Sequence, residues 1–375
     1  MKVVTSKHRA CKPPGKAEAG DSDKPQGVQD SGPSPMLPPG GRTGAGLRVS
    51  ALQRRDFLLW SVLSGLLTLP RPAEAQPTEP SMPSTSAPVL SGERVTLTSQ
   101  GQPVCLHVAG NGPALLLIHS VNAAASAAEV RPLHEHFQRT HTVFSIDLPG
   151  YGWSDRSDRA YTPGLMTAAL HDALALIRQR CGERPVDALA VSLSCEFLAR
   201  AASEAPAHFR SLALVSPTGL GSKDERRGPP GSTLAMPWLL GTLRGPGWDG
   251  LLFRGLTRPG VIRFFLNKTW GSSEIDEQLW QDAVATSQQE GARHAPLHFL
   301  SGGLFSRDIQ TIYESLSMPA WLSHGVRGDF TDYGKKSLLA SRPNWRMSVF
   351  PTGAMPYFEV TQAFCAEYQA FLESV

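Results

Sequence analysis

Short runs of consecutive apolar residues recur across residues 113–215, and segments with helical spacing separate them. The runs lie at residues 113–119, 142–146, 186–191 and 212–215. A short run that is apolar throughout is typical of a strand buried on both faces. Because strands and helices alternate, the sequence predicts an α/β protein with a mostly parallel sheet flanked by helices.

The remaining elements follow from the same periodicities. Further strands are expected at residues 94–98, 103–108, 319–324 and 346–350, and helices at residues 127–138, 167–180, 196–202 and 361–374. The alternation is interrupted at residues 217–310, which are rich in Gly and Pro and hold four Trp. The strands after this segment need the first sheet as a partner. We therefore expect one domain, residues 92–375, with a helical lid inserted after the sixth strand at about 217–310.

The N-terminal region has the pattern of an export signal. Residues 1–50 are polar and rich in Gly and Pro, which is typical of a disordered leader. Arg54 and Arg55 then precede 13 mostly apolar residues and the small-residue segment Ala73-Glu74-Ala75. This pattern predicts a twin-arginine-type signal peptide ending at residue 75, followed by a linker at 76–91. We expect the export machinery as a partner, and a periplasmic or secreted location in a bacterium.

The distribution of charge and the spacing of the cysteines narrow the possible classes of function. Residues 1–75 hold 11 Lys/Arg and 6 Asp/Glu, so 25 and 27 remain for the rest of the chain. A nearly neutral domain without a basic patch argues against nucleic-acid binding. The cysteines after residue 75 fit no zinc-binding spacing, and nothing in the sequence calls for a metal or cofactor.

The strand at 186–191 leads into the sequence Ala-Val-Ser-Leu-Ser and then directly into a helix. This is a loosened form of the G-x-S-x-G nucleophile elbow, in which small residues flank a serine on a strained turn. Ser192 is therefore the candidate nucleophile. The turn would put the Leu193 amide at a helix N-terminus, where it can stabilise an oxyanion. Ser194 is the alternative nucleophile, but it would need the bulky Glu196 where the turn requires a small residue.

Two further segments carry a family resemblance. Residues 116–121, Leu-Leu-Ile-His-Ser-Val, resemble the His-Gly oxyanion segment of the α/β-hydrolase superfamily, with Ser120 in place of Gly. Residues 147–154 resemble that superfamily's Asp-x-Pro-Gly-x-Gly-x-Ser turn. Along the chain, the two segments and the elbow follow one another in the same order as in the family. The resemblance covers residues 92–375 except the lid, and it implies the α/β-hydrolase fold.

The resemblance also implies roles for particular residues. The backbone amide of Val121 would be the second oxyanion donor, with the Asn122 side chain nearby. His119 and Asp147 would brace loops and would not take part in the chemistry. The catalytic acid would be Asp329, which lies one residue later than the usual spacing, so Asp332 remains an alternative.

The family's catalytic histidine is missing from its expected segment. The resemblance places it in a Gly-His-x-Pro-x-x-Glu pattern, and here Ala354 stands at the histidine position, between the matching Gly353 and Pro356. The last histidine of the chain is His324, just before the acid loop. His324 is the candidate substitute base, although it could equally be a hydrogen-bonded histidine at a strand end. His294 or His298 of the lid, the substrate itself or a chain of waters are alternatives.

Three functions follow from these residues. The first is a serine hydrolase acting on an ester, thioester or amide through Ser192, without a cofactor. The second is a non-catalytic protein that keeps the pocket and binds a ligand. The third is a lyase or cofactor-free oxygenase on the same fold. We expect a small molecule as the partner. Apolar lid residues at 251–253 and 264–265 could line a pocket for an apolar one, or they could simply seal the lid onto the sheet.

Overall fold

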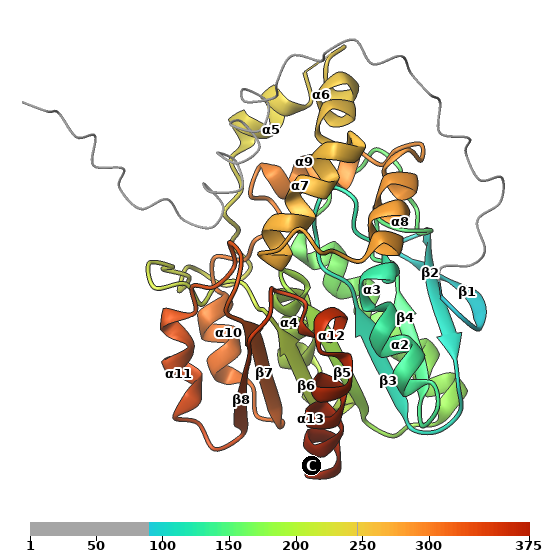
Figure 1. The fold of residues 1–375 in the computed structure, drawn as a ribbon, viewed down its shortest axis with the longest axis vertical. Coiled ribbons are helices and arrows are strands. Elements are labelled where there is room, and N and C mark those ends of the chain that lie inside the picture. The colour runs from blue at the N-terminus through green and yellow to red at the C-terminus, as the bar shows by residue number, and fades with distance from the viewer. Residues whose placement is uncertain (1–89, 246) are drawn as a thin grey trace, which may run out of the picture. The chain divides into compact units, whose positions relative to one another are not determined.

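The computed structural model describes residues 90–245 and 247–375 of the chain. Within them, eight strands form one sheet in the order β1-β2-β4-β3-β5-β6-β7-β8 (Figure 1). The strands are β1 (Glu93–Ser99), β2 (Gln102–Ala109), β3 (Ala114–Ile118), β4 (Thr142–Ile146), β5 (Val186–Val191), β6 (Phe209–Val215), β7 (Ala320–Gly325) and β8 (Trp345–Phe350). The leader and signal peptide predicted at residues 1–75, and the predicted linker up to residue 89, lie outside the described residues.

The sheet is mostly parallel, as predicted. Only β1 with β2 and β2 with β4 pair in antiparallel fashion, and the other neighbours are parallel. The hairpin between β1 and β2 turns at Gln100 and Gly101, whose φ angles are 48° and 77°. Positive φ at both central residues is the type I′ geometry that matches the twist of the flanking strands.

Each central strand contributes to two separate cores. Along β3, Leu116 and Ile118 belong to one buried cluster, whereas Leu115 and Leu117 belong to the other. Alternate side chains of a strand point to opposite faces, so an uninterrupted apolar run serves both. Helices therefore cover both faces of the sheet.

The helices are arranged in two layers beside the sheet and in one group beyond it. They are α2 (Arg131–Phe137), α3 (Pro163–Cys181), α4 (Ser194–Glu204), α5 (Pro237–Leu243), α6 (Asp249–Leu256), α7 (Pro259–Trp270), α8 (Glu277–Ser287), α9 (His294–Leu300), α10 (Ile309–Ser315), α11 (Ser337–Ala340), α12 (Pro356–Glu359) and α13 (Thr361–Glu373), with short 3₁₀ turns η1 (Ala127–Val130), η2 (Pro206–His208) and η3 (Gly334–Lys336). The α3 and α4 helices pack on one face of the sheet, and α2 and α13 pack on the other.

Helix α3 begins four residues before the predicted start at residue 167. The Thr162 side chain accepts a hydrogen bond from the Leu165 amide at 3.1 Å, and Pro163 occupies the first helical position. Both features are strong helix-start signals. They override the apolar spacing from which the later start was predicted.

The segment between β6 and β7 contains α5 to α10. Helices α5 to α9 gather at one end of the sheet, beyond the strands (Figure 1). Whether the segment works as a lid stays a prediction, and we call it the insertion. Among the described residues, no helix is both long enough and apolar enough to cross a membrane.

Candidate active site

Ser192 lies at the turn between β5 and α4. Every residue of β5 is buried, and α4 begins two residues after Ser192. The φ angle of Ser192 is 56°, in the left-handed region that residues other than Gly rarely adopt. Its amide donates to the Val215 carbonyl of the neighbouring strand β6 at 2.8 Å. The strand-to-helix turn thus has the strained geometry predicted for a nucleophile elbow.

Ser194, the alternative nucleophile, lies inside the fold. It is the first residue of α4, and its buried hydroxyl has no hydrogen-bond partner in the described part of the chain. Two residues later, the buried carboxylate of Glu196 pairs with Arg226 at 3.0 Å and accepts from the Ser306 amide at 2.7 Å. Burial raises the pKa of Glu196. Of the two serines, only Ser192 lines the cavity described next.

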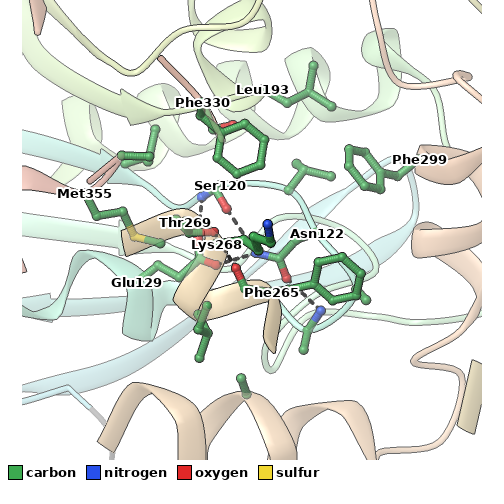
Figure 2. Close-up of a pocket in the computed structure, with 18 of the residues that line it drawn as sticks. Ser120, Asn122, Glu129, Leu193, Phe265, Lys268, Thr269, Phe299, Phe330 and Met355 are labelled. Carbon is green, nitrogen blue, oxygen red and sulfur yellow. Dashed lines mark hydrogen bonds between the residues drawn. The ribbon is translucent and has the colours of Figure 1, made fainter. Parts of the chain in front are cut away.

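A cavity of about 170 Å³ opens beside Ser192. The residues after three neighbouring strands supply one wall, among them Ser120, Ser192 and Ser216. The insertion supplies most of the rest through apolar side chains, including Leu256, Phe265, Leu279 and Phe299. Figure 2 shows apolar side chains, among them Phe265, Phe299 and Met355, around the polar groups of Ser120, Asn122 and Glu129. Such a lining is typical of a site for a small, mostly apolar molecule.

Two backbone amides beside Ser192 are unused. Val121 and Leu193 both line the cavity, and neither amide donates to any acceptor within residues 90–245 and 247–375. Buried amides are almost always paired, so two unpaired amides in one cavity wall need an explanation. Amides without an acceptor in a cavity wall are the donors that an oxyanion hole requires.

The Glu129 carboxylate holds the loop that carries Val121. It accepts from the Ser120 amide at 2.7 Å and from the Asn122 side-chain amide at 2.6 Å (Figure 2). The Asn122 side-chain carbonyl in turn accepts from the Ala124 amide at 2.8 Å. Asn122 therefore braces the loop, and both neighbours of Val121 are fixed through Glu129.

Asp329 and its alternative, Asp332, lie in different surroundings. Asp329 lines the cavity, and its carboxylate lies 3.6 Å from the Lys268 ammonium of α7. Asp332 does not line the cavity. Its carboxylate accepts from the amide and hydroxyl of Ser222, at 2.9 and 2.6 Å. The structure thus brings Asp329, and not Asp332, to the cavity that holds Ser192.

Ala354 is buried in the same cavity wall. Its amide donates to the Thr269 carbonyl at 2.9 Å, and its carbonyl accepts from the Ser216 hydroxyl at 2.7 Å. None of the described residues that line the cavity is a histidine. The ionisable side chains in the lining are those of Glu129, Lys268 and Asp329.

His324 lies outside the cavity lining. Its Nδ1–H donates to the Gly325 carbonyl at 2.8 Å, and its Nε2 accepts from the Lys336 ammonium at 3.0 Å. The ring also stacks on Tyr333, with 4.1 Å between the ring centroids. Both ring nitrogens are engaged, so the structure does not bring His324 together with Ser192.

The two histidines of the insertion contact groups outside the cavity lining, and the buried Nε2 of His298 has no hydrogen-bond partner among the described residues. His294 Nδ1 lies 3.6 Å from the Asp158 carboxylate, and the His298 ring packs edge-on against Tyr161. Burial lowers the pKa of both histidines. Neither lines the cavity. A base for Ser192 must therefore be sought among other groups.

The residues expected to brace loops do so. His119 donates to the Ser120 carbonyl at 2.5 Å and accepts from the Leu148 amide at 3.0 Å. Asp147 accepts from the amides of Ala127 and Trp153. Burial by itself would raise the pKa of Asp147, but the hydrogen bond and charge of His107 outweigh it and lower that pKa.

One buried cluster has ligand types that suit a metal ion. Cys105, His107 and Asp147 place ligand atoms within 4.8 Å of one another. However, burial raises the pKa of Cys105 to about 12, which favours the neutral thiol, whereas metals bind the thiolate. The oxygens of Asp147 also already accept hydrogen bonds. Its hydrogen bonds are those of a cluster that holds neighbouring loops in place. All four described cysteines are free thiols.

Comparisons with known proteins agree with this architecture. A family model described as the alpha/beta hydrolase fold matches residues 113–238. The solved structure of a His-tagged serine hydrolase involved in carbazole degradation superposes with a TM-score of 0.61 at 15% identity, covering 76% of this chain and 100% of its own. The chain has the α/β-hydrolase fold.

Other solved structures resemble this α/β-hydrolase fold. The enol-lactonase from Burkholderia xenovorans LB400 has a TM-score of 0.56 at 12% identity, covering 74% of this chain and 100% of its own. A meta-cleavage product hydrolase from Pseudomonas fluorescens IP01 has a TM-score of 0.57 at 13% identity, covering 75% and 97%. At such identities the likeness concerns the fold. A search of curated proteins gave no match.

Sequence reasoning missed two charged residues of this α/β-hydrolase fold's cavity. Glu129 follows the oxyanion segment by several residues, and its only sequence signal is a lone acidic residue within an Ala-rich stretch. Lys268 lies in the insertion, for which the family resemblance offers no guide. Both enter the cavity through tertiary packing, which local patterns do not encode.

Proposed function

We propose that this protein is an exported serine hydrolase that cleaves a small, mostly apolar ester, thioester or amide. The observation that carries the proposal is the position of Ser192, held at a strained turn in the wall of an apolar cavity beside two unpaired amides. A backbone conformation of this kind costs about 1–3 kcal/mol, so it persists mainly where function needs it.

In the proposed reaction, the Ser192 hydroxyl attacks the carbonyl carbon of the substrate. The oxygen that becomes negative would accept hydrogen bonds from the amides of Val121 and Leu193. Asp329 would take the role of the acid. Because Ala354 cannot accept a proton, and an unassisted serine is a weak nucleophile, the base is a non-standard one.

A fluorophosphonate probe with an intact-mass readout tests the proposal. The wild-type protein is expected to gain one adduct, and Ser192→Ala none. Ser194→Ala is the matched control, since that hydroxyl does not line the cavity, and it should still label. Absence of labelling in wild type at every pH, with an apolar ligand still bound, would instead support a binding protein without turnover. No histidine is found among the described residues that line the cavity, and this observation favours that second candidate.

Export by the twin-arginine route is proposed from the sequence pattern at Arg54 and Arg55. Replacing both by Lys is expected to leave the protein in the cytoplasm, because that route requires the arginine pair. Cell fractionation measures the change, with Arg48→Lys as the matched control. Mass spectrometry of the exported protein should find Gln76 at its N-terminus. An unchanged distribution for the paired variant would contradict the proposal.

A further inference from the structure

The C-terminal turn of α7 contacts two loops at once. The Asp329 amide donates to the Lys268 carbonyl at 3.1 Å, and the Ala354 amide donates to the Thr269 carbonyl at 2.9 Å. Carbonyls in the last turn of a helix have no partner within the helix. Here two consecutive ones are satisfied by the loop that holds the acid position and the loop that holds the histidine position.

Close glycine contacts fix this docking. Gly271 ends α7 in the left-handed conformation, with a φ of 62°. A Cβ atom at Gly271 would overlap the backbone of Gly328, and one at Gly353 would overlap the backbone of Trp270 and Thr269. The backbones therefore approach more closely than other residues would allow. The backbone of Lys268 is thereby held beside both loops, and its side chain, which is 43% exposed, extends from there.

Lys268 lines the same cavity as Ser192 and Ala354. Its Nζ lies 3.6 Å from the Asp329 carboxylate and 5.7 Å from the centre of the Phe264 ring. The other ionisable groups in the described lining are two carboxylates, and Glu129 is already committed to the oxyanion loop. Of the three, Lys268 is the one whose neutral form has an amine lone pair and whose long side chain can move.

We propose that Lys268 is the general base for Ser192 and that Asp329 stabilises the ammonium formed when Lys268 takes the proton. The inference rests on the proposed hydrolase function, and it names the base that this function lacks. Ala354 lines the same cavity as Ser192, and its methyl side chain fills less of that cavity than a histidine would. Serine and lysine serve together in other hydrolytic sites on unrelated folds.

The acylation step is balanced with these groups alone. The neutral Lys268 amine takes the proton of the Ser192 hydroxyl as the Ser192 oxygen bonds to the substrate carbonyl carbon. The carbonyl electron pair moves to the oxygen, which accepts from Val121 and Leu193. When the carbonyl re-forms, the bond to the leaving group breaks, and the leaving group takes the proton from Lys268. A water repeats the sequence to release the acid and restore Ser192.

Two variants distinguish whether Lys268 acts as a base or only as a fixed positive charge. Lys268→Arg keeps a positive charge beside Asp329 but cannot act as a base, because arginine stays protonated. We expect both Lys268→Arg and Lys268→Ala to lower the fluorophosphonate labelling rate at Ser192 by about 100-fold or more. Lys223→Ala, an exposed lysine outside the lining, is the control for loss of a lysine. Thermal unfolding checks that each variant folds.

The pH profile gives a second readout. An amine base must be neutral to accept a proton, so the wild-type and Lys268→Arg rates should differ in their dependence on pH, with Asp329 and Glu129 as the other charged groups in the described lining. In the double variant Ala354→His with Lys268→Ala, labelling should recover, and its rate should level off above about pH 6.5, the ordinary pKa of histidine. Recovery with this profile would show that the Lys268→Ala variant loses activity because it lacks a base.

The outcomes distinguish the two claims. Wild-type rates in both Lys268 variants, or loss only in His324→Ala, would overturn the assignment of Lys268 and leave the hydrolase intact. A normal rate in Lys268→Arg with loss in Lys268→Ala would overturn the base role in favour of a charge role. No labelling in wild type, in Ala354→His or in the double variant would overturn the proposed function and this inference together.

Discussion

A single carboxylate, that of Glu129, fixes the loop on which the proposed oxyanion donor Val121 lies. Its two oxygens hold the residues on either side of Val121, whose own amide has no acceptor among the described residues. Precise donor placement matters because hydrogen bonds aimed at developing charge contribute most when nothing must move. The role of Glu129 is to position, and it can be tested apart from the nucleophile.

Glu129→Ala is expected to reduce the rate of ester cleavage by up to about 100- to 1000-fold, the range seen for loss of one oxyanion donor. Removal of the carboxylate leaves the Ser120 amide and the Asn122 side chain without an acceptor, which should also destabilise the fold by about 1–3 kcal/mol. Steady-state kinetics and urea unfolding measure the two effects. Glu135→Gln, on the exposed side of α2, is the control. An unchanged kcat would contradict the positioning role.

Burial makes His134 a pH-dependent contact between α2 and its neighbours. Its Nε2–H donates to the Ser91 carbonyl at 3.1 Å, and its Nδ1 accepts from the Ser145 hydroxyl at 2.8 Å. Burial lowers the pKa of His134 to about 4. The unfolded chain takes up this proton near pH 6.5. Between those values the unfolded state binds more protons, so the free energy of unfolding falls as the pH falls.

Lowering the pH from 7 to 4 should therefore cost the wild type on the order of 3 kcal/mol through His134 alone. His134→Gln has no titrating ring and should lose correspondingly less across this window. Urea unfolding of both proteins at several pH values gives the difference, and since the other histidines are shared, they cancel in it. Parallel stability curves for the two proteins would rule the explanation out.

At the scale of elements, the strand positions could be predicted because buried parallel strands are apolar throughout. All eight predicted strands are confirmed within a few residues, although β6 begins three residues early, at Phe209. Helix ends were less accurate, as α3 shows, because a cap and a proline set its start. The docking of α7 could not be predicted, because it depends on two loops more than 50 residues further along the chain.

Gly271→Ala tests the docking of α7. The alanine would combine a positive φ with a backbone overlap at Gly328, so we expect a loss of about 1–3 kcal/mol in stability and a lower labelling rate at Ser192. Gly260→Ala is the matched control in the same helix. The space beside Gly260 is open, and alanine there should stabilise the protein slightly, by up to about 1 kcal/mol. If the Gly271→Ala variant unfolded at the same temperature as the wild type, the docking argument would be refuted.

At the scale of the whole molecule, the candidate site belongs to two parts of the fold. The sheet supplies Ser192, the two amides and Asp329, which the sequence resemblance could identify. The insertion supplies Lys268 and most of the apolar lining. The recognised motifs do not extend into the insertion. The part of the cavity that the sheet supplies could therefore be predicted from the sequence, whereas the part that the insertion supplies could not.

The modest volume of the cavity should limit the length of the acyl chain that a substrate can carry. A cavity of about 150 Å³ accepts a benzene ring, so about 170 Å³ has room for an acyl group of roughly six carbons. Along a series of p-nitrophenyl esters, kcat/KM should rise by roughly fourfold per added methylene until the space is filled. Beyond that length each further carbon must stay in water or force the helices of the insertion apart, so decanoate should be a poorer substrate than hexanoate.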